Sequence, residues 1–265
     1  MGKVYVVTSG KGGVGKTTTT ANLGAALAQA GQRVCLVDAD IGLRNLDVAL
    51  GLETRIIYDL VDVVEGYCKL KQALVKDRHL DKLFLLPAAQ TRDKTAVTPD
   101  EMRRLADGLR PGFDIVLVDC PAGIELGFQN AIAGADEALV VTTADVASVK
   151  DADRVIGLLE AEGHRMPRLI LNRMRPHLVR RGDMMSLDDV LEILAVDLLG
   201  VVPEDEQIVV NSNRGDPAVL VSSSKAGQAY RRIAHRLLGA SIPIPDMEET
   251  AGLVSRLRRL IGIEG

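Results

Sequence analysis

The residue types best suited to chemistry lie in a glycine-rich loop near the start of the chain. A glycine, four residues, then glycine, lysine and threonine is the spacing of a phosphate-binding P-loop, and an apolar run before it and a helical run after it supply the expected context. Glycines let backbone N–H groups approach phosphate oxygens, the lysine supplies charge to the β and γ phosphates, and the threonine hydroxyl completes the coordination of Mg²⁺. We therefore expect ATP and Mg²⁺ to bind at Gly10, Lys11, Gly12, Gly13, Val14, Gly15, Lys16, Thr17 and Thr18.

This loop carries one lysine more than a P-loop needs. Lys16 stands at the start of the expected helix, where it reaches phosphates bound in its own subunit. For Lys11, on the far side of the loop, two interpretations are open. It is either a solvated loop lysine, or a catalytic charge that stabilises the phosphoryl group of a nucleotide bound across an interface, as an arginine finger does. The loop resembles the deviant Walker A motif of a family of dimerising ATPases, in which the equivalent of Lys11 acts in trans.

Acidic residues stand at the ends of two further expected strands. Asp119 follows four apolar residues, a Walker B pattern in which the carboxylate holds Mg²⁺ directly or through water, together with Thr17. Asp38 and Asp40 are two residues apart, so they project to the same side if the strand continues through them. We assign Asp38 to the water shell of the metal and Asp40 to orienting the attacking water. The alternative is a pair of residues that only caps the next turn.

Residues at two later strand ends suggest which base is bound. Asn172-Arg173 follows an apolar run, but the aspartate that accepts from guanine in Asn-Lys-x-Asp sites is missing, which favours adenine. Pro203, Glu204 and Asp205 follow another strand and are expected to close the other side of the base pocket through backbone groups. An asparagine at a strand end can instead stabilise a turn by hydrogen-bonding the backbone, and this alternative stays open.

Short apolar runs alternate with helical patterns along the chain. Continuous apolar strands such as residues 115–118 suit a sheet buried on both faces, so we predict an α/β fold with a doubly wound, mostly parallel sheet flanked by helices, whose ligands bind at the carboxyl ends of the strands. The predicted strands are Lys3–Thr8, Arg33–Asp38, Lys82–Leu86, Asp114–Asp119, Glu137–Thr143, Arg168–Asn172 and Leu199–Pro203. The predicted helices are Lys16–Ala30, Leu70–Lys76, Pro99–Leu109, Leu126–Ala133, Val146–Glu162, Leu187–Leu194 and Lys225–Leu238.

Composition indicates one globular domain whose main partner is not nucleic acid. The chain of 265 residues is 47% hydrophobic, has a net charge of −4 and a pI near 5.7, and contains few aromatic residues that could stack on bases. The three cysteines, Cys35, Cys68 and Cys120, form no CxxC pair and suit reduced thiols in the cytoplasm. No signal peptide or transmembrane run is visible in the sequence.

The last residues are the second segment, after the P-loop, whose pattern strongly predicts a function. We predict an ATPase domain over residues 1–239, a proline-containing linker over 240–249 and an amphipathic membrane-targeting helix over 250–265. Apolar residues recur there at helical spacing while arginines occupy other faces, which suits an anionic membrane surface. One such helix should bind weakly, whereas two held in an ATP-dependent dimer gain an effective-concentration advantage of about 10²–10⁴. The alternative is a terminal helix packed on the domain. The expected membrane contacts are Leu253, Leu257, Leu260 and Ile261.

Taken together, these motifs and their order closely resemble the MinD family of bacterial septum-site-determining ATPases. The resemblance covers residues 10–18, 38–47, 118–125, 172–173 and 202–205 and the terminal helix. It implies an ATP-dependent homodimer, peripheral on the cytoplasmic face of the inner membrane, that recruits a division inhibitor (MinC-like) and is released by an activator (MinE-like) that stimulates hydrolysis. Residues 148–154 match the helix on which both partners dock in that family, so Asp151 and Asp153 are carried over as partner contacts.

Other members of the same ATPase class remain as alternatives. A regulator of flagellar placement shares the loop and a similar tail. A DNA-partitioning ATPase needs a basic surface, for which Arg173, Arg175, His177, Arg180 and Arg181 are the candidates. An iron–sulfur ATPase of the nitrogenase type needs paired cysteines, a spacing that the three cysteines of this chain do not supply.

Overall fold

An eight-stranded sheet forms the centre of the chain in a computed structural model that describes residues 2–164 and 166–245. The strand order is β3-β4-β2-β5-β1-β6-β7-β8, and every neighbouring pair is parallel except β3 with β4. The strands are β1 (Lys3–Thr8), β2 (Val34–Asp38), β3 (Val75–Lys76), β4 (Leu83–Leu86), β5 (Ile115–Asp119), β6 (Glu137–Thr143), β7 (Arg168–Met174) and β8 (Asp197–Pro203).

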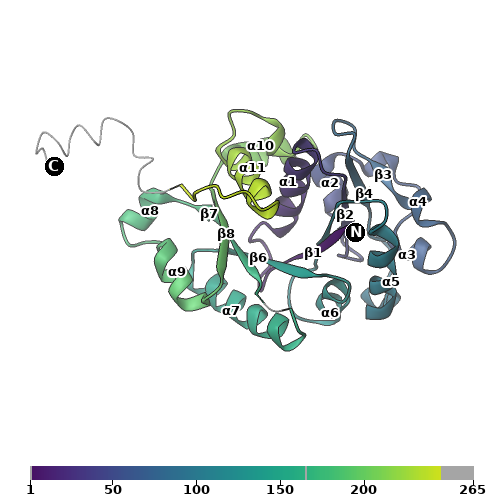
Figure 1. Cartoon of the computed structure of the whole chain (residues 1–265), viewed down its shortest axis with the longest axis horizontal. Coiled ribbons are helices and arrows are strands. Elements are labelled where there is room, and N and C mark those ends of the chain that lie inside the picture. Colours follow the sequence, from purple (N-terminus) through teal and green to yellow (C-terminus); the bar gives the residue numbers. More distant parts are fainter. Residues whose placement is uncertain (1, 165, 246–265) are drawn as a thin grey trace, which may run out of the picture.

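Helices cover both faces of this sheet, as Figure 1 shows. Every residue of β5 is buried, and successive residues pack into opposite cores: Val116 with the helices of one face, Leu117 with those of the other. One face carries α3 (Leu60–Val64), α5 (Pro99–Leu109), α6 (Leu126–Ile132), α7 (Val146–Ala161) and α9 (Leu187–Leu194), and the other carries α1 (Lys16–Gln29), α2 (Leu46–Leu50) and α11 (Lys225–Leu237). The remaining helices are α4 (Leu70–Ala73), α8 (Pro176–Arg180) and α10 (Glu206–Ser212), with short 3₁₀ turns at Glu53–Arg55, Lys94–Ala96 and Ala218–Leu220.

The predicted fold class is confirmed, and one predicted helix is wrong in its second half. Helix α4 ends at Ala73, and residues 75–76 form the edge strand β3, which pairs antiparallel with β4. Val75 is buried against the sheet while Lys76 is exposed, a strand alternation too short to be recognised in the sequence. The short helices α2, α3, α8 and α10 were also not predicted, because five to seven residues carry little periodicity.

The first residues of the predicted linker, 240–245, contact the body of the domain. Arg236 of α11 donates from Nε to the carbonyl of Ile242 at 2.7 Å and from Nη2 to that of Pro243 at 2.8 Å, while its Nη1 bonds the carbonyl of Leu199 in β8 at 3.0 Å. Ile244 then packs against the core on the opposite face of the sheet from α11. Residues 242–244 are therefore held beside the edge strand β8.

The predicted membrane contacts Leu253, Leu257, Leu260 and Ile261 lie outside the described residues. Within residues 2–164 and 166–245, none of the helices has the length and apolarity needed to cross a bilayer.

Candidate nucleotide site

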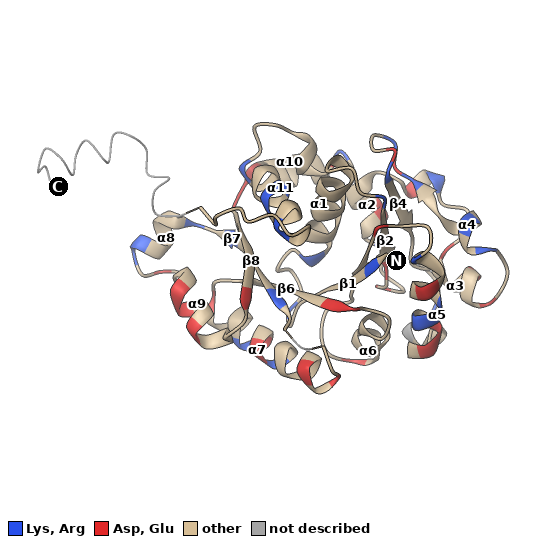
Figure 2. Cartoon of the chain, in the orientation of Figure 1, with Lys and Arg blue, Asp and Glu red and all other residues tan. Residues whose placement is uncertain are grey.

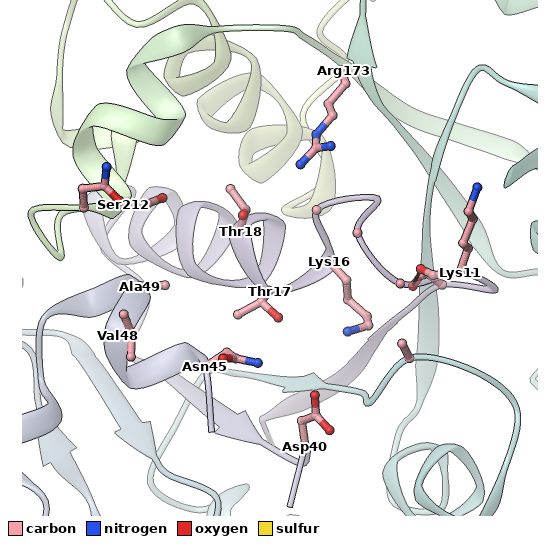
Figure 3. Close-up of a pocket in the computed structure, with 16 residues that line it drawn as sticks. Lys11, Lys16, Thr17, Thr18, Asp40, Asn45, Val48, Ala49, Arg173 and Ser212 are labelled. Carbon is pink, nitrogen blue, oxygen red and sulfur yellow. Dashed lines mark hydrogen bonds between the residues drawn. The ribbon is translucent and has the colours of Figure 1, made fainter. Parts of the chain in front are cut away.

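The glycine-rich loop lines an open cavity of about 450 Å³ beside the carboxyl ends of β1 and β2 (Figure 3). Gly13 and Gly15 adopt positive φ angles of 83° and 94°, a conformation that other residues rarely take. Gly15 precedes the first turn of α1, so the free N–H groups of that turn face the cavity with the positive end of the helix dipole. This backbone geometry is the kind that binds anions at a helix N-terminus.

A buried carboxylate organises the first turn of α1. The Thr17 hydroxyl donates to Asp119 Oδ2 at 2.7 Å and the Thr20 hydroxyl to Asp119 Oδ1 at 2.9 Å, while Lys16 Nζ lies 4.0 Å from Oδ1. Burial raises the pKa of Asp119, an effect that the charge of Lys16 and the hydroxyl of Thr17 oppose. Strand β5 ends at Asp119 and directs it at the helix start, so Asp119 holds the side chains of Lys16, Thr17 and Thr20 together.

The donor set around Thr17 suits Mg²⁺. Among the described residues, no three His, Cys, Asp or Glu side chains form a cluster that could enclose a metal ion. Mg²⁺ needs no such cluster, because it keeps several waters and binds through one or two protein oxygens plus substrate phosphates. A threonine hydroxyl with an aspartate behind it, next to a phosphate cradle, matches that chemistry.

Asp38 and Asp40 occupy different environments, contrary to the expected shared side. Strand β2 ends at Asp38, so the alternation that would align the two carboxylates stops there. Asp38 is buried, and its oxygens accept the N–H groups of Asp40 at 3.0 Å and Leu46 at 3.1 Å. Burial and the neighbouring Asp119 carboxylate raise the pKa of Asp38 to about 7. Asp38 therefore anchors the loop that presents Asp40.

Asp40 itself lines the main cavity across from Lys16 (Figure 3). Its Oδ1 is buried and has no hydrogen-bond partner in the described chain. A buried carboxylate oxygen without a donor is costly, so it usually serves a ligand, a water or catalysis. The geometry fits the role of orienting a water next to the phosphates.

Lys11 is exposed and points away from Lys16 and Asp40, on the other side of the loop (Figure 3). Its charge acts on Asp145, which caps the N-terminus of α7. Burial favours the protonated form of Asp145, but hydrogen bonds from Thr143 and Ser148 and the charge of Lys11 lower its pKa overall. Lys11 lines the cavity, but its side chain extends to the other side of the loop from Lys16 and Asp40, and both interpretations of Lys11 stay open.

Helix α7 packs directly against the start of the loop. A Cβ added at Gly10 would lie 2.2 Å from the carbonyl oxygen of Asp151, so only glycine allows this approach. Asp151 is half-buried at this contact, whereas Asp153 is exposed on the same helix. The predicted partner residues thus lie on a helix in contact with the P-loop.

A second cavity of about 240 Å³ adjoins the first and contains the predicted base residues. Asn172 donates from Nδ2 to the carbonyl of Val14 at 2.8 Å, which fastens β7 to the P-loop. Arg173 has a positive φ of 55° and lines both cavities. Pro203, Glu204 and Asp205 line the opposite side, together with Ile208, Val209 and Tyr230.

Sequence reasoning missed several residues of both cavities. The buried hydroxyl of Tyr230 hydrogen-bonds that of Thr19 at 3.0 Å, but in the sequence Tyr230 only continues the apolar face of a helix. The wall of the main cavity opposite the P-loop comes from the short helices α2 and α10 and their ends, which gave no sequence signal: Asn45, Val48, Ala49, Ser212 and Asn213.

Asp205 uses its carboxylate to join α10 to α11. Its oxygens accept the N–H of Gln207 at 3.0 Å, the Ser224 hydroxyl at 2.8 Å and the N–H of Ala226 at 3.0 Å.

We expect Asp205→Ala to lower the free energy of unfolding by about 2–3 kcal/mol, because two helix N-termini lose their acceptor. Urea denaturation followed by circular dichroism measures this change. Asp189→Ala, which removes the carboxylate that accepts the N–H of Ser186 at the exposed start of α9, is the control and should cost about 1 kcal/mol. Equal midpoints for the Asp205→Ala chain and the wild type would contradict the assignment.

The basic cluster that a DNA-binding protein would need is largely compensated. Arg175 pairs with Glu204 at 3.1 Å and Arg181 with Asp183 at 2.9 Å, and Arg173 belongs to the nucleotide cavities. Figure 2 shows the basic α8 next to the acidic α9. Two of the four arginines in this cluster are thus paired with carboxylates, which reduces the positive charge available to a nucleic acid backbone.

Comparisons with known proteins agree with this geometry. Residues 5–218 match the family model described as the CobQ/CobB/MinD/ParA nucleotide binding domain. The septum site-determining protein MinD of Bacillus subtilis (strain 168) is 55% identical over 266 residues, which cover 99% of each chain.

Two solved structures share both fold and sequence with the chain. One is the MinC:MinD cell division protein complex of Aquifex aeolicus, with 47% identity, a TM-score of 0.87, and coverage of 92% of this chain and 99% of that one. The other is the septum site-determining protein MinD complexed with Mg-ADP from Pyrococcus horikoshii OT3, with 31% identity, a TM-score of 0.82, and coverage of 91% and 100%.

Proposed function

The chain belongs to the MinD family of septum site-determining proteins, and from this premise we propose that it is a Mg²⁺-dependent ATPase that dimerises around ATP and thereby switches its attachment to the membrane. The proposal rests on the different positions of the two lysines in the P-loop. Both lysines line the cavity, but Lys16 lies against Asp119, whereas the Lys11 side chain extends to the other side of the loop.

In this proposal the residues of one subunit bind the nucleotide. Backbone N–H groups of residues 10–18 and the Lys16 ammonium hold the phosphates. Thr17, with Asp119 behind it, holds Mg²⁺, which neutralises phosphate charge when bound. Asn172, Arg173, Pro203, Glu204 and Asp205 border the base, Asp205 through its backbone because its carboxylate caps helices. The Mg-ADP bound by the Pyrococcus horikoshii relative supports this ligand assignment.

In this proposal hydrolysis depends on two charged side chains, one from each subunit. Asp40 Oδ1, which has no donor among residues 2–164 and 166–245, orients the attacking water. Lys11 of the opposite subunit stabilises charge on the transferred phosphoryl group, so the rate rises only in the dimer. For Asp38 the geometry favours anchoring the Asp40 loop over a place in the water shell of the metal.

Dimerisation in turn controls attachment to the membrane. Each copy carries one terminal amphipathic segment with Leu253, Leu257, Leu260 and Ile261 as its apolar contacts, each contributing roughly 1 kcal/mol when partly inserted. A single segment of this length is marginal as a helix and binds weakly. Two segments on one dimer bind together, with an advantage of about 10²–10⁴. Loss of the γ phosphate releases both.

Helix α7 is the proposed docking site for the partner proteins. Asp151 and Asp153 are the residues assigned to it, and the contact of Gly10 with Asp151 links this helix to the nucleotide loop. We assign a MinC-like division inhibitor as one partner, which the complex of the Aquifex aeolicus relative supports, and a MinE-like activator as the other. Recruitment of the inhibitor positions the division septum.

Sedimentation with anionic vesicles tests this function. We expect the full chain to pellet with the vesicles in Mg·ATP and to stay in the supernatant in Mg·ADP, with at least about a tenfold difference in apparent affinity. A chain lacking residues 250–265 should stay in the supernatant in both, while retaining ATP hydrolysis. Equal pelleting in the two nucleotides would contradict the switch, and duplex DNA in place of vesicles should show no ATP-dependent binding.

A further inference from the structure

Two short helices that form the far wall of the nucleotide cavity meet at a pair of glycines. Gly51 ends α2 with a φ of 62°, and Gly215 ends the turn after α10 with a φ of 68°. A Cβ added at Gly215 would lie 2.4 Å from the Cα of Gly51, so the two backbones are in direct contact. No larger residue fits at either position, because the space and the left-handed conformation both exclude it.

A single guanidinium covers this glycine contact from the outside. Arg78 donates from Nη2 to the carbonyls of Arg214 at 3.1 Å and Gly215 at 2.9 Å, and to Asp216 Oδ1 at 2.9 Å. A Cβ on Gly51 would lie 2.6 Å from the same nitrogen. His79 Nε2 lies 3.1 Å from Asp216 Oδ1 and adds a second contact to that carboxylate.

The turn that carries Arg78 is itself rigid. It connects the edge strand β3 to β4, and the buried Asp77 accepts the N–H groups of His79 and Leu80, both at 2.8 Å. Arg78 therefore reaches the glycine contact from a fixed position on the sheet. All three of its bonds come from one nitrogen, Nη2, whose two N–H groups are shared among the three acceptors.

We propose that Arg78 is a positioning residue for nucleotide binding, which clamps the ends of α2 and α10 together and so fixes the wall formed by Val48, Ala49, Ser212 and Asn213 against the P-loop. The inference rests on the proposed nucleotide function. Arg78 does not line the cavity, so it acts through the backbone of the two helices. The start of α2 and the Asp40 loop are both held by Asp38, so the clamp acts at the opposite end of α2 from the Asp40 loop.

If Arg78 clamps the two helices, its removal should weaken nucleotide binding without slowing turnover. In the full chain, Arg78→Ala should raise the Kd for Mg·ADP, measured by calorimetry, and the KM for Mg·ATP by about tenfold, while kcat stays within about twofold. Arg78→Lys restores one of the contacts and should recover part of the affinity. Asp216→Ala should weaken binding as well, and the double variant should be no weaker than Arg78→Ala alone, since both residues act in one contact.

Arg103→Ala is the matched control. Arg103 also bonds a carbonyl, that of Ala133, and a carboxylate, that of Asp100, but on α5 and away from the cavity. Its Kd and KM should equal those of the wild type. If Arg78→Ala does not fold, Asp216→Asn, which weakens the charge-assisted bond, serves in its place and should raise Kd about threefold.

The outcomes separate this inference from the function on which it rests. A wild-type chain that binds neither Mg·ADP nor Mg·ATP would refute the proposed function. A wild-type chain that binds both, with Kd and KM unchanged in the Arg78 and Asp216 variants, would overturn the clamp alone. So would an equal rise of Kd in the Arg103 control, because it would indicate a general loss of structure.

Discussion

Replacing Asp40 with alanine should leave ATP binding within about twofold of the wild type and lower kcat by about 10²-fold or more. The carboxylate lines the cavity, and its Oδ1 has no donor in the described chain, so it contributes little to holding the fold. Its loss removes the group that orients the attacking water and leaves the phosphate cradle intact. Steady-state hydrolysis and equilibrium binding of Mg·ATP measure the two quantities separately.

Asp38→Ala is the contrasting variant. Asp38 holds the N–H groups of Asp40 and Leu46, so its loss should lower the free energy of unfolding by about 2–3 kcal/mol besides slowing hydrolysis. Asp40→Ala should change that free energy by less than about 1 kcal/mol. An Asp40→Ala chain with wild-type turnover would remove Asp40 from the mechanism.

Replacing Lys11 with alanine should abolish the ATP-dependent dimer and reduce hydrolysis by about 10²-fold or more. Binding of Mg·ADP to one subunit should change little, because the Lys11 side chain extends away from Lys16 and Asp40 on the other side of the loop (Figure 3). Sedimentation velocity in Mg·ATP and Mg·ADP measures the dimer. Lys150→Ala, which removes an exposed lysine from α7, is the control and should dimerise as the wild type does. ATP-dependent dimers of the Lys11→Ala chain would refute the role in trans.

The parts of the site that the sequence predicts well are those coded by consecutive residues or by strand ends. The P-loop is one continuous segment, so its geometry follows from its own glycines. Asp119 and Asn172 come from parallel strands, whose carboxyl ends meet at one edge of a sheet, so their approach to the loop follows from the fold class.

The parts that the sequence does not predict depend on where elements stop. Asp38 and Asp40 would share a side only if strand β2 continued for two more residues beyond Asp38. Strand boundaries cannot be predicted from the sequence to that accuracy. The cavity wall from α2 and α10 comes from helices of five and seven residues, too short for a periodic signal. Arg78 meets Gly215 across 137 positions in sequence, and no local pattern connects them.

The most direct test of the account is a crystal structure of the Asp40→Ala chain with Mg·ATP. The account predicts a symmetric dimer in which Lys11 Nζ lies about 3 Å from a phosphate oxygen of the nucleotide held by the partner subunit. Lys16 should contact the phosphates of its own subunit in the same structure. Two subunits whose Lys11 side chains extend into solvent, away from either nucleotide, would contradict the account.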